Sequence, residues 1–140
     1  MLPSGLPESV GNEEDLARFL TSSNWFSEQK AIVKPAAFLP NPRRDYETSV
    51  FRHGAEPLEQ LWEIGIEQIR AERSWHGVAV VKTRHVRSAA LEVAASEPPP
   101  RHANIVGWPR DDSDPDMMKA KQKELALKIA AVAVLIKRAG

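Results

Sequence analysis

The segment PLEQLWEIGIEQIRAERSWHGVAVVKT, residues 57–83, contains both kinds of secondary structure that we expect in this chain. In its first half, apolar side chains recur every three or four residues, which is the spacing of one helix face. Pro57 suits the first turn of a helix, where its missing N–H costs little. After Gly77 the run VAVV is short, apolar and rich in β-branched residues, as in a buried strand. We therefore expect a helix over 57–72 that packs on a sheet containing a strand over 77–83.

Short segments with strand character lie on both sides of this region. Short strands joined by loops that contain proline favour an antiparallel sheet, which we expect to carry its helices on one face. Near the N-terminus, Leu16, Phe19 and Leu20 form an apolar stripe behind Asn12, a pattern that predicts a short capped helix. The expected elements are a helix over 13–21, strands over 30–33, 36–39, 47–53, 90–95 and 102–108, and a last helix over 115–138.

These elements predict an α+β protein: a small, largely antiparallel sheet packed by two main helices plus a short N-terminal helix. The chain has 140 residues, which is the size of one domain. Residues 1–11 contain two prolines and two glycines, and we expect them to form a flexible N-terminal tail. The single α+β domain is then expected over 12–140.

Charge and cysteine content limit the classes of function. The chain contains 19 basic and 19 acidic residues, which argues against a surface that attracts nucleic acid everywhere. Residues 79–110, however, contain five cations and two anions, whereas residues 1–24 contain four anions and one cation. A local site for an anion is therefore compatible with the zero total. The absence of cysteine excludes disulfides, thiol nucleophiles and thiolate metal sites.

The sequence also bears on location. The N-terminal segment lacks the basic and apolar regions of a secretory signal. The longest apolar run, residues 129–136, is too short to cross a bilayer as a helix. We expect a cytoplasmic protein that does not contact a membrane.

Histidine follows arginine at three places that lie at or near expected strand ends. Arginine offers a planar set of donors to a phosphate group, and histidine can transfer a proton near neutral pH. In the segment RHANIVGWP, residues 101–109, strand alternation places His102 and Asn104 on one face. The candidate catalytic residue is His102. The candidate ligand-binding residues are Arg52, His53, Arg84, Arg101, His102 and Asn104.

Three functions are compatible with these residues. The first is a binding domain for an anionic ligand, a nucleic acid segment or a partner protein. The second is a metal-independent, ribonuclease-like enzyme in which His102 acts as general base or acid and Arg52 or Arg101 contacts the phosphate. The third is an assembly module, or a homodimer, that uses the apolar C-terminal helix as its interface.

Other kinds of site find no support in the sequence. No metal-ligand spacing and no glycine-rich phosphate loop occurs, so we expect neither a metal nor a cofactor. Neither Ser49 nor Ser74 lies in the sequence context of a nucleophile elbow.

Two segments carry a resemblance. Ser49-Val-Phe-Arg-His together with Arg101-His-Ala-Asn-Ile-Val-Gly-Trp-Pro resembles a signature of an uncharacterised family of small bacterial proteins. The resemblance covers about a dozen positions and implies no activity. It implies only that the two segments belong to one site.

Overall fold

The computed structural model describes residues 1–53, 58–69 and 73–138 of the chain. The strands are β1 (Asp15–Leu20), β2 (Phe26–Ser27), β3 (Ile32–Val33), β4 (Thr48–Arg52), β5 (Gly77–Lys82), β6 (Glu92–Ala95), β7 (His102–Val106) and β8 (Val134–Lys137). The helices are α1 (Leu58–Gln68), α2 (Thr83–Ser88) and α3 (Pro115–Val132), with short 3-10 helices η1 (Ser23–Trp25), η2 (Pro35–Ala37) and η3 (Pro42–Arg44).

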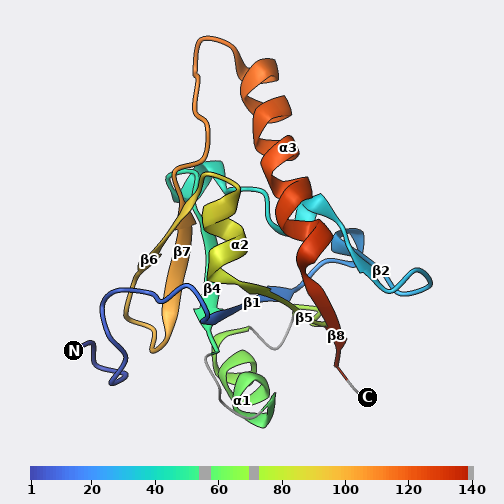
Figure 1. Ribbon diagram of the computed structural model, residues 1–140. Helices are drawn as coiled ribbons and strands as arrows, with labels where there is room; N and C mark the ends of the chain where they lie inside the picture. Colours follow the sequence, from blue (N-terminus) through green and yellow to red (C-terminus); the bar gives the residue numbers. More distant parts are fainter. Residues whose placement is uncertain (54–57, 70–72, 139–140) are drawn as a thin grey trace.

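The predicted α+β class with a largely antiparallel sheet is confirmed. Six strands form one sheet in the order β6-β7-β4-β1-β5-β8, and neighbouring strands run antiparallel (Figure 1). β2 and β3 pair separately. Among the described helices, none has the length and apolar character needed to cross a membrane.

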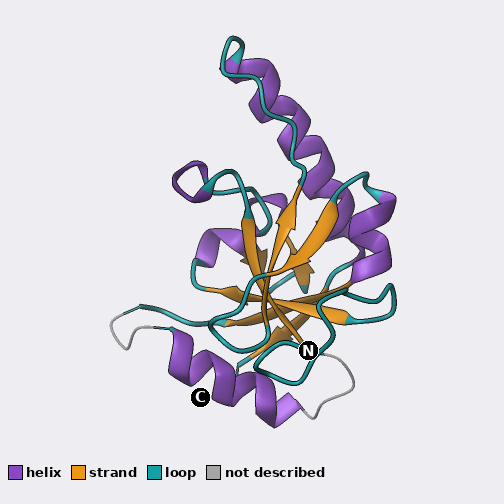
Figure 2. Cartoon of the chain, turned by 90° about the vertical axis from the view of Figure 1, so that its left-hand side faces the viewer, coloured by secondary structure: helices purple, strands orange, loops and turns teal. Residues whose placement is uncertain are grey.

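Helices cover both faces of the sheet, so the expectation of helices on one face is wrong. α1 lies on one side of the strands and α3 on the other (Figure 2). On the α1 side the buried core contains Ala17, Phe19, Phe51, Leu61 and Val78. On the other side, α2 and α3 cover a larger core that includes Leu16, Val50, Val81, Ile105 and Ile129.

β1 replaces the short N-terminal helix that the sequence predicts over 13–21. Leu16 and Leu20 face the α3 side of the sheet, whereas Ala17 and Phe19 face α1, and all four side chains are buried. β1 lies between β4 and β5 and pairs with both. Because a central strand is apolar on both faces, its residues also match the spacing of a helix stripe.

The last expected helix, over 115–138, is shorter in the structure. The side chain of Asp114 accepts a hydrogen bond from the N–H of Met117 and caps α3. The helix ends at Val132, the backbone of Ala133 is extended, and β8 then pairs with β5. The first turns of α3 extend away from the sheet (Figure 1). The proposed interface helix is therefore a helix followed by an edge strand.

Other elements differ in detail. The strand expected over 36–39 is replaced by the 3-10 helix η2, because Pro35 starts a turn, and the strand expected over 30–33 contains only β3. α2, which the sequence did not predict, begins directly after β5. Of the helix expected over 57–72, the structure shows α1, and residues 57 and 70–72 lie outside the described residues. The strands expected near 47–53, 77–83, 90–95 and 102–108 are confirmed as β4, β5, β6 and β7.

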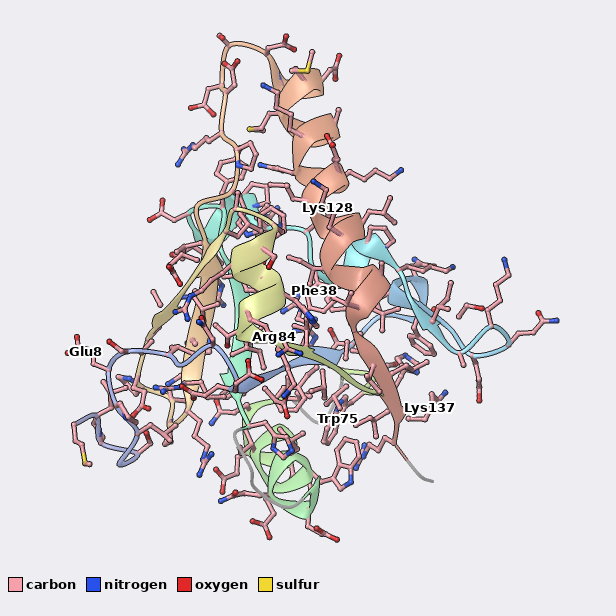
Figure 3. The ribbon with its side chains drawn as sticks, in the orientation of Figure 1. Glu8, Phe38, Trp75, Arg84, Lys128 and Lys137 are labelled. Atoms are coloured by element: carbon pink, nitrogen blue, oxygen red, sulfur yellow. The ribbon has the colours of Figure 1, made fainter. Side chains whose placement is uncertain are left out.

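Close approach at Gly65 allows α1 to reach the sheet. A Cβ atom at this position would lie 2.2 Å from the ring of Trp75. The Trp75 ring, labelled in Figure 3, stacks edge-on against Phe19 and Trp62, with ring centroids 5.5 Å away in each case. Its indole N–H donates to the carbonyl of Gly77 at 2.9 Å. Aromatic rings thus join the end of β1 to the middle of α1.

Candidate functional site

A cleft of about 1110 Å³ opens on the face of the sheet that carries α1. Its floor is formed by side chains of β4 and β7, namely Ser49, His102 and Asn104. The loop over 41–47 and the turn over 96–99 form its walls, and the end of α1 closes one side. Alternation along the two strands explains why these three polar side chains share a face.

The pairing of β4 with β7 places Ser49 beside His102. Ser49 lies opposite Asn104 in the register, and Phe51 lies opposite His102. The Oγ atom of Ser49 lies 2.6 Å from Nε2 of His102. The other ring nitrogen, Nδ1, lies 2.9 Å from the carbonyl oxygen of Ser96. A carbonyl can only accept, so Nδ1 carries the proton, Nε2 accepts, and the hydroxyl of Ser49 donates.

The environment of His102 favours its neutral form. Burial lowers the pKa of His102 below its usual value of 6.5, and the nearby charge of Arg44 lowers it further. The hydrogen bond to Ser96 and the charge of Glu47 act in the opposite direction without reversing the effect. The imidazole is therefore neutral at pH 7 and can accept a proton at Nε2.

Among the described residues that line the same cleft, four are arginines and two are acidic. The arginines are Arg18, Arg43, Arg44 and Arg73, and the acidic residues are Asp45 and Glu47. Within the described residues no ion pair joins an acidic side chain to any of these four arginines. The cleft therefore has an excess of positive charge.

Arg18, in the central strand β1, also lines the cleft and adds to this positive charge. Its Nε donates to the carbonyl of Ala37 at 2.8 Å and its Nη1 donates to the carbonyl of Ser49 at 3.0 Å. The guanidinium also lies 4.6 Å from the ring centroid of Trp25. Burial, with a smaller contribution from the neighbouring charge of Arg73, lowers the pKa of Arg18 to about 10. Arg18 remains charged at neutral pH but lies in a positive environment.

Backbone hydrogen bonds fix the loop that carries Arg43 and Arg44. The carbonyl of Asn41 accepts from the N–H groups of Arg44 and Tyr46 at 2.9 and 3.0 Å, and its side chain accepts from the N–H of Arg43. Asp45 and Tyr46 both adopt the left-handed conformation, with φ of 57° and 55°. Residues other than glycine rarely adopt this backbone conformation, and strained backbone of this kind is frequent at binding sites.

The structure brings together only part of the set of residues that the sequence predicts. His102 and Asn104 share the cleft. Arg52 lies on the opposite face of β4, where its register partner is Leu16, and its side chain is fully buried. Its guanidinium donates to the Glu14 carboxylate and to the carbonyls of Pro7 and Ser9. A pocket shared by Arg52 and His102 is therefore not formed.

The remaining candidates lie outside the cleft lining. Arg84, labelled in Figure 3, projects from α2 and forms an exposed ion pair with Glu13 at 3.1 Å. The Nη1 of Arg101 approaches the carbonyl of Arg52 at 3.4 Å. His53, directly after β4, donates its backbone N–H to the carbonyl of Asp15 at 2.8 Å.

Sequence reasoning missed Ser49 and the four arginines of the cleft. Ser49 lies on the same face of β4 as Phe51, a relation that alternation alone predicts. Its contact with His102, however, depends on the register between β4 and β7. Arg43 and Arg44 follow a proline within an irregular segment, where no periodic pattern indicates direction.

No known family model, curated protein or solved structure matches this chain. Within the described residues, no group of three or more histidine or acidic side chains is arranged to hold a metal ion. The two segments that carried the expected resemblance overlap the paired strands β4 and β7. A function is therefore inferred from the geometry of the cleft itself.

Proposed function

We propose that this protein binds an anionic, phosphate-bearing ligand in the cleft between α1 and the loop over 41–47. The observation that carries the proposal is the lining of the cleft, where the described residues include four arginines together with His102 and Asn104, against two acidic residues. Guanidinium groups form paired, charge-assisted hydrogen bonds with phosphate oxygens. The class of ligand is the one that the sequence predicts. Its proposed site is this cleft, which does not include the predicted contacts Arg52 and Arg84.

Electrostatic repulsion within the cleft supports the proposal. The charge of Arg73 contributes to the lowered pKa of Arg18, and the charge of Arg44 disfavours protonation of His102. A bound anion relieves both effects, because it places negative charge among cations that otherwise repel one another. The volume of about 1110 Å³ is slightly above the range of about 300–1,000 Å³ for small-molecule sites and accommodates a nucleotide-sized ligand.

The proposal is tested by calorimetric titration of the protein with inorganic pyrophosphate. Arg44→Ala removes one charge-assisted contact, which is worth about 1.5–3 kcal/mol. The expected result is a dissociation constant raised about ten- to a hundredfold. Affinity should also fall between 50 and 200 mM salt, because the attraction is electrostatic.

Arg84→Ala is the matched control. It also removes an exposed arginine, but from α2 and outside the cleft lining. Its affinity for pyrophosphate should equal that of the unmodified protein. Equal losses in Arg44→Ala and Arg84→Ala, or no binding by the unmodified protein, would contradict the proposed site.

A further inference from the structure

We propose that Ser49 is a nucleophile and His102 its general base, so that the cleft hydrolyses a carboxylic ester of an anionic molecule. The anionic character of the substrate rests on the proposed function. The catalytic pair itself rests on separate observations at the floor of the cleft. These are the contacts of Ser49, His102 and Ser96 and the position of Asn104.

The arrangement of the pair is the one that general-base catalysis requires. The hydroxyl of Ser49 donates to Nε2 of His102 at 2.6 Å. A third group, the carbonyl oxygen of Ser96, lies 2.9 Å from Nδ1 and keeps the ring proton on that nitrogen. A nucleophile, a base and a group that orients the base are the parts by which covalent hydrolases are recognised, whatever their fold.

The backbone around Ser49 is held from two sides. β7 pairs with β4 at this position, with Asn104 opposite Ser49. On the other side, the carbonyl of Ser49 accepts a hydrogen bond from Nη1 of Arg18 at 3.0 Å. The nucleophile therefore stands on a rigid strand, which limits the loss of entropy needed to reach a reactive geometry.

Asn104 is placed to stabilise the negative charge that develops on the substrate. It lies opposite Ser49 in the register, and side chains opposite each other on paired strands lie about 5 Å apart at Cβ. Its carboxamide lines the cleft and makes no hydrogen bond with the described part of the chain. An amide N–H that is free to donate can bind the oxyanion of a tetrahedral intermediate.

The reaction has two steps. In the first, Oγ of Ser49 forms a bond to the ester carbonyl carbon while its proton passes to Nε2 of His102. The bond from that carbon to the alcohol oxygen then breaks, and the alcohol leaves with the proton from Nε2. In the second, His102 takes a proton from water, the hydroxide attacks the acyl carbon, and Ser49 leaves with the proton. One ester and one water give one acid and one alcohol.

Labelling with an uncharged alkyl fluorophosphonate tests the pair. The reagent forms a bond from phosphorus to an activated serine oxygen and releases fluoride, and mass spectrometry of the peptides identifies the residue. The expected result is one adduct, on Ser49. Ser49→Ala should abolish it, and His102→Gln should slow it at least a hundredfold. Ser113→Ala, which changes a serine in an exposed loop, should leave labelling unchanged.

The pH dependence of labelling provides a second measurement that needs no variant. Because burial keeps His102 neutral, the labelling rate should fall only as the pH drops below the ordinary histidine value. A hydroxyl without a neighbouring base should instead react at a rate that rises with pH throughout. In parallel, Asn104→Ala should lower hydrolysis of a p-nitrophenyl ester about a hundredfold with an unchanged circular dichroism spectrum.

The outcomes separate this inference from the proposed function. The fluorophosphonate is uncharged, so its reaction does not depend on anion binding by the arginines. Labelling of Ser49 without pyrophosphate binding would contradict the anion site only. Pyrophosphate binding without labelling, or labelling at another serine, would overturn the catalytic pair. Labelling at an unchanged rate in His102→Gln would also overturn it, because Ser49 would then need no base.

Discussion

Replacing Arg52 with alanine should destabilise the protein strongly. Nε and Nη2 of Arg52 donate to the two carboxylate oxygens of Glu14 at 2.8 and 2.9 Å. Nη1 donates to the carbonyl of Pro7 at 2.7 Å, and Nη2 approaches the carbonyl of Ser9 at 3.4 Å. The arginine side chain is 0% exposed and that of Glu14 is 22% exposed. Arg52→Ala therefore leaves a largely buried carboxylate and two carbonyls without their donor.

The expected loss follows from this burial. Removing one partner of a buried ion pair costs about 3–5 kcal/mol, a large share of the roughly 5–15 kcal/mol that stabilises a typical domain. Arg84 provides the matched control, because it also pairs with a glutamate, Glu13, but both side chains are more than half exposed. Exposed pairs contribute about 0–1 kcal/mol. The two variants should therefore differ by about 3 kcal/mol.

Urea unfolding, followed by tryptophan fluorescence, measures the difference. With a slope of about 2 kcal/mol per molar urea, Arg52→Ala should lower the midpoint by about 1.5–2.5 M. Arg84→Ala should lower it by less than about 0.5 M. Equal shifts in the two variants, or a loss below about 1 kcal/mol for Arg52→Ala, would refute the reasoning and return Arg52 to the set of candidate ligand contacts.

Three further predictions concern packing and acid stability. Gly65→Ala places a Cβ 2.2 Å from the Trp75 ring and should cost about 1–3 kcal/mol; an unchanged melting temperature would contradict this. Gly77→Ala places a Cβ 2.3 Å from the carbonyl oxygen of Ile136, at a residue whose φ is +151°. The clash should weaken the pairing of β5 with β8, so amide hydrogens in β8 should exchange faster. Unchanged protection of these amides would contradict the clash. Burial acts to raise the pKa of Glu14, but hydrogen bonds, chiefly from the side chain of Arg52, outweigh it and hold the pKa below 4.5. Between the two pKa values, the unfolded chain binds a proton that the folded chain does not. The stability advantage of the unmodified protein over Glu14→Gln should therefore be complete above pH 4.5 and shrink as the pH falls through the lowered pKa. An advantage independent of pH would contradict this.

The elements that the sequence predicts correctly are those whose pattern depends on their own residues. β4 and β7 alternate visibly, and α1 has an apolar stripe with a glycine on it. β1 fails because both of its faces are buried, so the period of two is lost. β8 fails because its partner is β5, more than fifty residues earlier, and no local signal shows that the helix must end at Val132.

The site follows the same rule. Alternation correctly places His102 and Asn104 on one face, because that relation lies within a single strand. Alternation does not show which face of β4 lies beside His102 and Asn104. For this reason the sequence indicates Arg52 as a candidate and not Ser49. Arg44 lies in the short 3-10 helix η3 and Arg73 lies between α1 and β5, where the sequence has no apolar period, and only the folded chain brings them to the cleft.

The central position of β1 has a consequence for synthesis. It is the first strand in the sequence but lies inside the sheet, between β4 and β5, which end at residues 52 and 82. A chain that leaves the ribosome from its N-terminus carries β1 without a partner until those segments have followed it, and pairing across such distances is slow. During this interval both apolar faces of the strand are open to other chains, which favours aggregation. A strand that the finished protein buries on both faces is thus one that a growing chain leaves exposed until two later segments arrive.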